Sequence, residues 1–190
     1  MKLLYSIYWF VTWIIYGSRL KVGRNAKFRG GGSVKKGKTI YIGDDFFIGK
    51  DFLLATYPIN GKFGKIQIGN NVVAQERVRI SAAESIVIGN NVLLASDILI
   101  IDNNHGMDAS SDKTYMYQEI SSKPIKIGDG CWIGEKCTIL PGSLIGEKCI
   151  IGANSVVTGE IPAYTIAVGI PAKPTKKWNF ALNRWERIIK

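Results

Sequence analysis

Aliphatic residues recur every six positions in the second half of the chain, a spacing that fits neither a helix nor a single strand. The members of this series are Ile127, Ile133, Ile139, Ile145, Ile151, Val157 and Ala163. A small or apolar residue stands four places after each of the first six, and these residues are Cys131, Cys137, Ser143, Cys149, Ser155 and Ile161. Two inward positions in every six describe a short strand and a tight turn, so the pattern predicts a solenoid.

The repeat extends toward the N-terminus as short related strings. IGDDF, IGNNV, IGNNV, IGDGC and IGEKC begin at Ile42, Ile68, Ile88, Ile127 and Ile145. In the late repeats, equivalent positions such as Ile127, Ile145 and Ala163 stand 18 residues apart, which predicts three rungs to one triangular coil. Each coil needs its neighbours to bury its apolar side chains, and no linker divides the chain, so we expect one all-β domain over 22–177.

Two of the coils are too long and must carry insertions. Ile42 and Ile68 are 26 residues apart, which predicts about eight extra residues around Pro58 to Lys65. Ile88 and Ile127 are 39 residues apart, which predicts an excursion of about 21 residues in the polar loop 102–124. A loop of that length in a compact solenoid is usually functional.

Charge is concentrated at the two ends of the chain. Residues 1–43 hold nine Lys or Arg and no acid, and residues 173–190 hold six basic residues and one acid, within a net charge of +10. Basic ends suit anionic lipid or a phosphorylated ligand. The sequence has no basic and aromatic interleaving typical of a nucleic-acid recognition module, so no nucleic-acid partner is expected. We expect the segment 178–190 to be either an irregular tail or a short terminal helix, and the helical spacing of its apolar residues supports the second option.

The N-terminal segment 1–21 predicts a helix with an apolar and aromatic surface. The uncharged stretch from Leu3 to Tyr16 has 14 residues, whereas a membrane span needs about 20. Two interpretations stay open. Residues 3–29 could lie on the membrane surface, with the protein cytoplasmic and peripheral on the inner face of the membrane, or the helix could cap the open end of the solenoid.

One motif match has the wrong context. Gly32 to Thr39 has the sequence GSVKKGKT, which satisfies the pattern of a phosphate-binding loop. That loop must lead into a helix, but here Ile40 to Gly43 begins a rung. We therefore interpret the string as a basic, glycine-rich crossing between coils.

The three cysteines and the single histidine limit the available chemistry. Cys131, Cys137 and Cys149 all fall on inward positions, which predicts apolar packing in a reducing compartment. One histidine and no paired cysteines leave no spacing typical of a metal site.

His105 is the strongest candidate for catalysis. It lies in the string IIDNNHGMD, where the repeat ends and the long loop begins, so a rigid coil would position an accessible side chain. An ordinary imidazole is largely neutral at cellular pH and can accept a proton. Asp102 could fix the tautomer of the ring, and no Ser or Cys adjoins His105 to serve as a covalent nucleophile.

With these features, the chain resembles the hexapeptide-repeat acyltransferases, which fold as left-handed parallel β-helices. It is most similar to their acetyltransferases of bacterial polysaccharide and O-antigen biosynthesis. The strings that carry the resemblance are DNNHG at 102–106, Gln118, CWIG at 131–134, LPG at 140–142, GANSVVT at 152–158 and VGIPAKPTKKW at 168–178. Left-handedness is implied by the resemblance alone.

The resemblance implies homotrimers with active sites between neighbouring subunits and acetyl-CoA as co-substrate, and it makes His105 the general base. Implied contacts to acetyl-CoA are Trp132, Gly134, Gly152, Ala153, Thr158, Lys173 and Lys176. From the residues themselves, we expect Asp102 as the catalytic partner of His105 and no metal, and the expected contacts to the acceptor are Asn103, Asn104 and Gln118. Two departures stand out: Gly159 and Glu160 occupy a place where many relatives carry Lys, and Asn103 replaces a second His.

The expected function is O-acetylation of a sugar in a surface-glycan precursor. N-acetylation of a nucleotide-linked amino sugar is an alternative that the same base and donor groove could perform. A noncatalytic trimeric scaffold is an alternative of another class, and the retained His105 argues against it.

Overall fold

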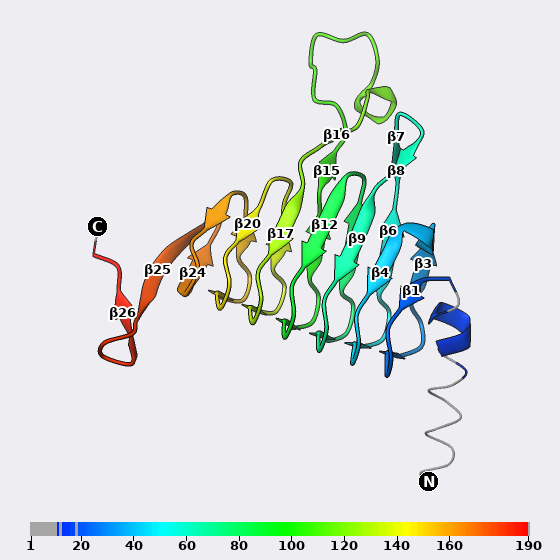
Figure 1. Cartoon of the computed structure of the whole chain (residues 1–190). Helices are drawn as coiled ribbons and strands as arrows, with labels where there is room; N and C mark the ends of the chain where they lie inside the picture. Colours follow the sequence, from blue (N-terminus) through cyan, green and yellow to red (C-terminus); the bar gives the residue numbers. More distant parts are fainter. Residues whose placement is uncertain (1–10, 12, 18, 190) are drawn as a thin grey trace.

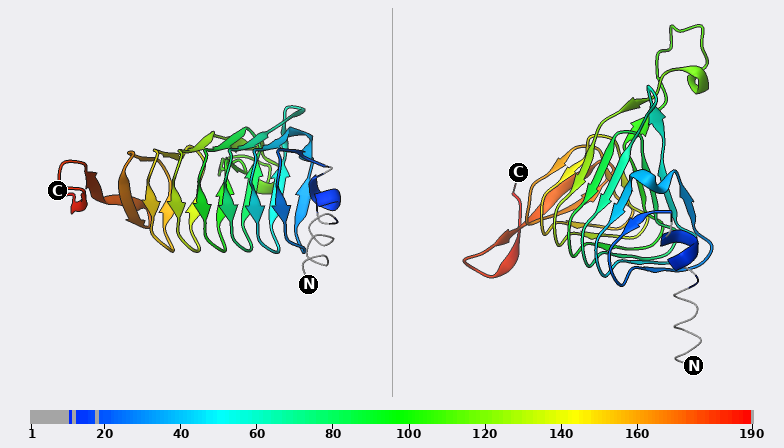
Figure 2. Two further views of the ribbon diagram at one scale, coloured as in Figure 1. Left: turned by 60° about the horizontal axis from the view of Figure 1, so that its bottom comes forward. Right: turned by 45° about the vertical axis from the view of Figure 1, so that its right-hand side comes forward.

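The computed structural model describes residues 11, 13–17 and 19–189, and nearly all of their regular structure is strand. The strands wind as successive triangular coils into a prism with three sheets of parallel strands (Figure 1). Each coil gives one strand to each sheet, so residues about 20 positions apart stack directly on one another. Figure 2 shows the prism from two other directions, with the N-terminus and C-terminus at opposite ends.

Three sheets form the faces of the prism. The first sheet contains β1 (Lys21–Val22), β4 (Ile40–Ile42), β9 (Lys65–Ile68), β12 (Ser85–Ile88), β17 (Ile125–Ile127), β20 (Leu144–Ile145) and β23 (Glu160–Ile161). The second contains β2 (Lys27–Phe28), β5 (Phe47–Ile48), β10 (Val73–Ala74), β13 (Leu93–Leu94), β18 (Trp132–Ile133), β21 (Ile150–Ile151), β24 (Thr165–Gly169), β25 (Ala172–Asn179) and β26 (Arg184–Arg187). The third contains β3 (Ser33–Lys35), β6 (Leu53–Thr56), β11 (Arg79–Ala82), β14 (Leu99–Ile101), β19 (Thr138–Ile139) and β22 (Val156–Val157).

The remaining elements are two small hairpins and three short helical segments. The hairpins pair β7 (Pro58–Ile59) with β8 (Lys62–Phe63) and β15 (Asn103–Asn104) with β16 (Ser121–Ser122). The helical segments are η1 (Trp13–Gly17), η2 (Gly37–Thr39) and η3 (Tyr115–Tyr117). The string GSVKKGKT spans β3 and η2 and leads into β4, so its interpretation as a crossing between coils is confirmed.

The core is a continuous column of aliphatic side chains inside the prism. The predicted inward positions from Ile127 to Val157 are confirmed, because each aliphatic member is at most 2% exposed. The three cysteines are also buried, and each thiol donates a hydrogen bond to a main-chain carbonyl of the next coil. Successive rungs therefore share one apolar core that is interrupted only by small polar or thiol groups.

The last coil is shorter than the six-residue spacing predicts. Ile145 pairs with Ile161 rather than Ala163, and Ile151 pairs with Ala167, so this coil has 16 residues. Only Thr158 and Gly159 separate β22 from β23, whereas four residues fill the same corner one coil earlier. The prediction that Ala163 takes the inward position was therefore wrong, and Ala163 is half-buried in a turn.

The early coils are longer than predicted. Val22 pairs with Ile42, and Ile68 pairs with Ile88, which makes these coils 20 residues long. The insertion after Ile42 is therefore six residues rather than eight, and it forms the hairpin of β7 and β8. Both insertions lie at the corner between the third and the first sheets, where they leave the stacking of the coils intact.

One corner of the prism is stabilised by a ladder of side-chain caps. The backbone amide of Asp44 donates to Asn70 Oδ1, that of Asn70 to Asn90 Oδ1, and that of Asn90 to Asp129 Oδ1, at 2.8–2.9 Å. The hydrogen bonds from Asn90 hold the pKa of Asp129 below its usual range, so the carboxylate stays an ionised acceptor. The recurring Asn or Asp after Ile-Gly thus accepts a hydrogen bond from a backbone amide in the turn of the preceding coil.

The C-terminal segment forms strands, so the option of a terminal helix was wrong. β25 pairs antiparallel with β24 and with β26, and the rings of Trp178 and Trp185 pack edge to face with centroids 5.3 Å apart. Asn183 adopts a φ of 49° in the connecting turn. The spacing of Trp178 and Trp185 fits one face of a helix, but it also lets the two rings oppose each other across a hairpin. The residues of the turn between them favour the hairpin.

Tyr16 of the N-terminal segment packs on the open end of the prism. The ring of Tyr16 packs against Phe28 and Phe52, with centroids 6.1 and 5.1 Å away. Among the described residues, no helix is long and apolar enough to cross a bilayer. The expected helix upstream of Val11 lies outside the described residues, and the boundaries of the three predicted segments stay predictions.

Candidate functional site

The long insertion places His105 at a corner of the prism. β14 of the third sheet leads into β15, which pairs antiparallel with β16 before the chain enters the first sheet. The loop closed by this stem projects away from the coils (Figure 2). His105 directly follows β15 and is exposed, and in the described part of the chain its imidazole makes no hydrogen bond. Its nitrogens are therefore available to a ligand.

Gln118 braces this loop from inside. Its Nε2 donates to the carbonyl oxygens of Asp108 and Lys113, at 2.8 and 2.9 Å, and its Oε1 accepts from the amide of Asp108 at 2.9 Å. A Cβ on Gly106 would lie 2.5 Å from Cβ of Gln118, so only glycine fits there. Gln118 therefore holds the loop beside His105, and its role as an acceptor contact stays a prediction.

Asp102 anchors the base of the loop to the previous coil. It is completely buried, and its Oδ1 accepts from the amide of Ala83 at 2.7 Å. Its Oδ2 accepts from the amides of Glu84 and Ser85 at 2.9 and 2.8 Å. Nδ2 of the neighbouring Asn103 also donates to Oδ1, at 3.0 Å. With both oxygens occupied, Asp102 holds the base of the loop, and its direct action on the imidazole of His105 stays a prediction.

A cavity of about 300 Å³ lies under the loop, beside His105 in the chain. Its lining residues are Asn104, Met107, Ser121, Ser122, Lys123, Leu140, Pro141 and Thr158. The structure thus brings together two predicted ligand contacts, Asn104 and Thr158, at one corner of the prism. Predicted acceptor contact Asn103 is paired with Ser122 in the stem instead.

The sequence did not identify Lys123 as a site residue. Its carbonyl accepts from the amide of Gly142 at 3.1 Å, which stacks the end of the loop on the corner of the following coil. The sequence signal for Lys123 was its place at the end of the loop, one coil before the string LPG at 140–142. Using that signal requires the register between the two coils, which the spacing of the repeat gave only approximately.

The other predicted acetyl-CoA contacts lie elsewhere on the same chain. Trp132 is half exposed on the outer face of the second sheet, and Lys173 and Lys176 are exposed on β25. Gly134, Gly152 and Ala153 lie in the turns that join the second sheet to the third. Within a single chain, the structure does not bring this group into the cavity beside His105.

The two glycines of this group have a packing role. A Cβ on Gly134 would lie 2.6 Å from the amide nitrogen of Ala153, and one on Gly152 would lie 2.6 Å from Cγ1 of Val168. Gly134 is therefore needed for close stacking of coils, because the backbone leaves no room for a side chain, whereas Gly152 closely faces only a side chain.

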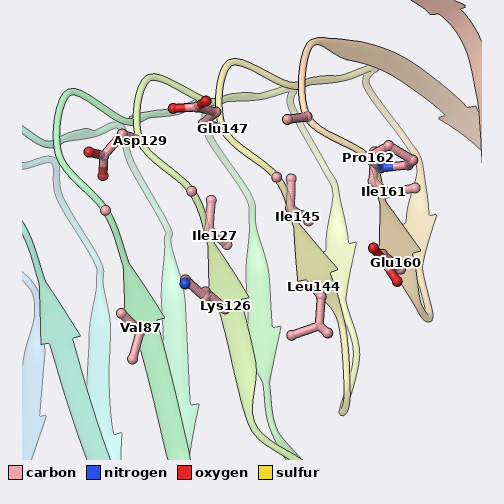
Figure 3. A pocket seen from close by; sticks show the side chains of 14 residues that line it. Val87, Lys126, Ile127, Asp129, Leu144, Ile145, Glu147, Glu160, Ile161 and Pro162 are labelled. Carbon is pink, nitrogen blue, oxygen red and sulfur yellow. The ribbon is translucent and has the colours of Figure 1, made fainter.

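A larger groove of about 500 Å³ runs along the outer side of the first sheet in the late coils (Figure 3). Lys126, Leu144 and Glu160 line it, together with turn residues such as Asp129 and Glu147. It includes none of the predicted site residues. The loop cavity, which adjoins the only histidine of the chain, is the better candidate for chemistry.

Loss of the brace at Gln118 is expected to lower turnover without unfolding the β-helix. Gln118→Ala removes three hydrogen bonds inside the loop, so kcat should fall about tenfold while the melting temperature changes little. Hydrogen exchange of residues 104–121 should accelerate in the variant. The matched Gln118→Glu keeps the acceptor and loses the donors, so it should be intermediate. Unchanged exchange in Gln118→Ala would refute the brace.

Comparison with known proteins agrees with the repeat. Residues 124–159 match the family model for the bacterial transferase hexapeptide with six repeats. A putative lipopolysaccharide biosynthesis O-acetyl transferase of Escherichia coli, WbbJ, is 38% identical over 65% of this chain and 66% of its own length. The galactoside O-acetyltransferase of Escherichia coli is 34% identical over 64% of this chain and 59% of its own length. The matches thus span two thirds or less of these relatives.

Solved structures share the architecture. A variant of AntD, an N-acyltransferase from Bacillus cereus crystallised with dTDP-4-amino-4,6-dideoxyglucose and coenzyme A, superposes with a TM-score of 0.73 at 18% identity, over 90% of this chain and 91% of its own. A hexapeptide-repeat acetyltransferase from Vibrio cholerae superposes with a TM-score of 0.57 at 27% identity, over 85% and 76% of the two chains. With its coil repeat, family match and relatives, the chain belongs to the hexapeptide-repeat transferases of left-handed parallel β-helix fold.

Proposed function

We propose that this protein transfers an acetyl group from acetyl-CoA to a sugar hydroxyl in the biosynthesis of a bacterial surface polysaccharide. The observation that carries the proposal is an exposed His105 on a braced loop, beside a cavity large enough for part of a sugar. The similarity to a lipopolysaccharide O-acetyl transferase supports the class of acceptor. The similarity to a galactoside O-acetyltransferase supports transfer to oxygen.

In this proposal His105 is a general base in a direct transfer. A nitrogen of the imidazole takes the hydroxyl proton while the sugar oxygen attacks the thioester carbonyl. A new carbon–oxygen bond forms, and collapse of the tetrahedral intermediate breaks the carbon–sulfur bond. The coenzyme A thiolate leaves and receives the proton from the imidazolium. The buried cysteines cannot form an acyl intermediate, so positioning of both substrates and base catalysis supply the acceleration.

A homotrimer would complete the site. The proposed acetyl-CoA contacts Trp132, Gly152 and Lys176 lie on or after the second sheet, whereas His105 lies at the corner between the third and first sheets. A neighbouring subunit can place its second-sheet side against this corner. An outward row of apolar residues along the second sheet supports self-association, and its members are Phe47, Val73, Leu93, Trp132, Ile150 and Ile166.

The basic residues near the C-terminus suit the phosphates of coenzyme A. Lys173 and Lys176 are exposed on β25, and Lys177 lies beside them. In the described part of the chain, none of the three is in an ion pair. Where many relatives carry a lysine, Gly159 ends the shortened corner and Glu160 begins β23, so the phosphate contacts would come from β25 instead.

The proposed reaction predicts thiol release that depends on a sugar acceptor. Incubation with acetyl-CoA and a panel of sugars should release free coenzyme A only with a hydroxyl acceptor, and mild alkali should remove the acetyl group from the product. An alkali-stable product would instead indicate N-acetylation of an amino sugar. Absence of thioester consumption with every acceptor, by a trimeric protein that is folded, would indicate a scaffold and overturn the proposal.

A further inference from the structure

The N-terminal end of the prism directs apolar side chains outward. Val11, Trp13 and Ile15 are 41–47% exposed, whereas Tyr16 turns inward onto the aromatic core. The segment thus has two sides, one that covers the first coil and one that faces solvent. Capping accounts for Tyr16, but it leaves the outward residues without a role.

A cationic pocket begins at Arg19, shortly after η1. It has a volume of about 580 Å³, and Arg19, Lys36 and Lys38 line it together with the apolar side chains of Val34 and Phe63. The ammonium of Lys36 lies 5.6 Å from the centroid of the Phe63 ring. Apolar walls beneath several cations suit an amphipathic ligand better than a fully hydrated ion.

Close packing fixes this pocket beside the end of η1. A Cβ on Gly37 would clash with the carbonyl oxygen of Arg19, so the glycine of the GSVKKGKT string allows the crossing to touch the segment after η1. Arg19 therefore connects η1 to the cations of this crossing, at the same end of the prism. We call Val11, Trp13, Ile15, Arg19, Lys36 and Lys38 together the end face.

The charge of the end face is uncompensated. The sequence contains no acidic residue before Asp44. Among the described residues, no ion pair involves Arg19, Lys36 or Lys38. By contrast, Arg24 contacts Asp44 and Arg29 contacts Glu76. The end face thus combines unpaired cations with exposed aromatic and aliphatic groups.

We propose that the end face docks the protein on an anionic phospholipid bilayer. Val11, Trp13 and Ile15 enter the interface, and Arg19, Lys36 and Lys38 contact the lipid phosphates. Because the coils stack away from this end, the β-helix stands out from the membrane with its catalytic loop on the side. This inference goes beyond the proposed reaction, since it places the protein at a membrane surface.

Vesicle flotation of the full chain tests this proposal. Wild-type protein should float with vesicles of equal phosphatidylglycerol and phosphatidylcholine, and not with phosphatidylcholine alone. Arg19→Gln with Lys38→Gln should weaken the partition coefficient about 30-fold, because each cation contributes about fivefold at an anionic surface. Trp13→Ser with Ile15→Ser should weaken it at least about tenfold. Added salt should weaken binding of the wild type.

A matched double variant controls for net charge. Lys136 and Lys148 are exposed in late coils. At roughly 4.8 Å per coil, they lie about 20 Å from the end face along the axis of the prism, which exceeds the screening length of physiological salt. Lys136→Gln with Lys148→Gln should change partition less than about twofold. Wild-type protein that fails to float, or end-face variants that float like the wild type, would overturn the proposal. Turnover on a water-soluble acceptor should be unchanged in every variant, which separates this test from that of the reaction.

Discussion

His105→Ala is expected to lower kcat by about 10²–10⁴-fold while leaving the affinity for acetyl-CoA nearly unchanged. The reason is chemical: without the imidazole, water must accept the hydroxyl proton as the sugar oxygen attacks. The donor contacts proposed on the second sheet and β25 are separate from His105 within the chain, so binding of coenzyme A should persist. Steady-state kinetics with a soluble acceptor, together with calorimetric titration of coenzyme A, measure the two effects.

Two controls distinguish loss of the base from damage to the loop. Tyr117→Ala changes an exposed residue of the same loop that does not line the cavity, and it should retain near-normal turnover. Added imidazole should partly restore His105→Ala, because the site is open to solvent. Turnover of His105→Ala within about threefold of wild type would remove the assignment.

The repeat of the sequence predicted the solenoid and most of its inward positions, because each rung buries its side chains in the same way. It failed where a corner changed length. The spacing put Ala163 in the core, but the two-residue corner at Thr158 and Gly159 moved Ile161 into register with Ile145. Both alternatives place a small or aliphatic residue inward, so hydrophobicity alone could not separate them. The register depends on stacking between coils, which is a property of tertiary structure.

The location of the candidate site was predictable from the sequence, but the hydrogen bonds within it were not. Sequence context placed His105 at the start of a long loop, and the structure places it exposed beside a cavity. The polar neighbours Asp102 and Gln118 were interpreted as catalytic or acceptor groups, yet both are used to satisfy backbone groups. A polar residue in a site-like string can serve the ligand or the backbone. Only the position of the surrounding amides decides between these roles.

Asp102→Ala is expected to destabilise the protein by about 3–5 kcal/mol and to lower kcat as well. The substitution removes the acceptor of the amides of Ala83, Glu84 and Ser85, and the amide of Ala83 is left buried without a partner, which is costly. The same change frees the start of β15, and therefore the base of the loop that holds His105. Urea denaturation gives the free energy of unfolding, and kinetics under strongly native conditions give kcat.

Comparison with two further variants separates the buried anchor from an ordinary cap. Asp129 also accepts from a backbone amide of the preceding coil, that of Asn90, but Asp129 is exposed. Water can therefore replace the lost acceptor in Asp129→Ala, and the loss of stability should be much smaller. Asp102→Asn keeps one acceptor oxygen in the same shape, and it should recover part of the stability and of kcat. If Asp102→Ala were no less stable than Asp129→Ala, the buried carboxylate would not be what ties the catalytic loop to the β-helix.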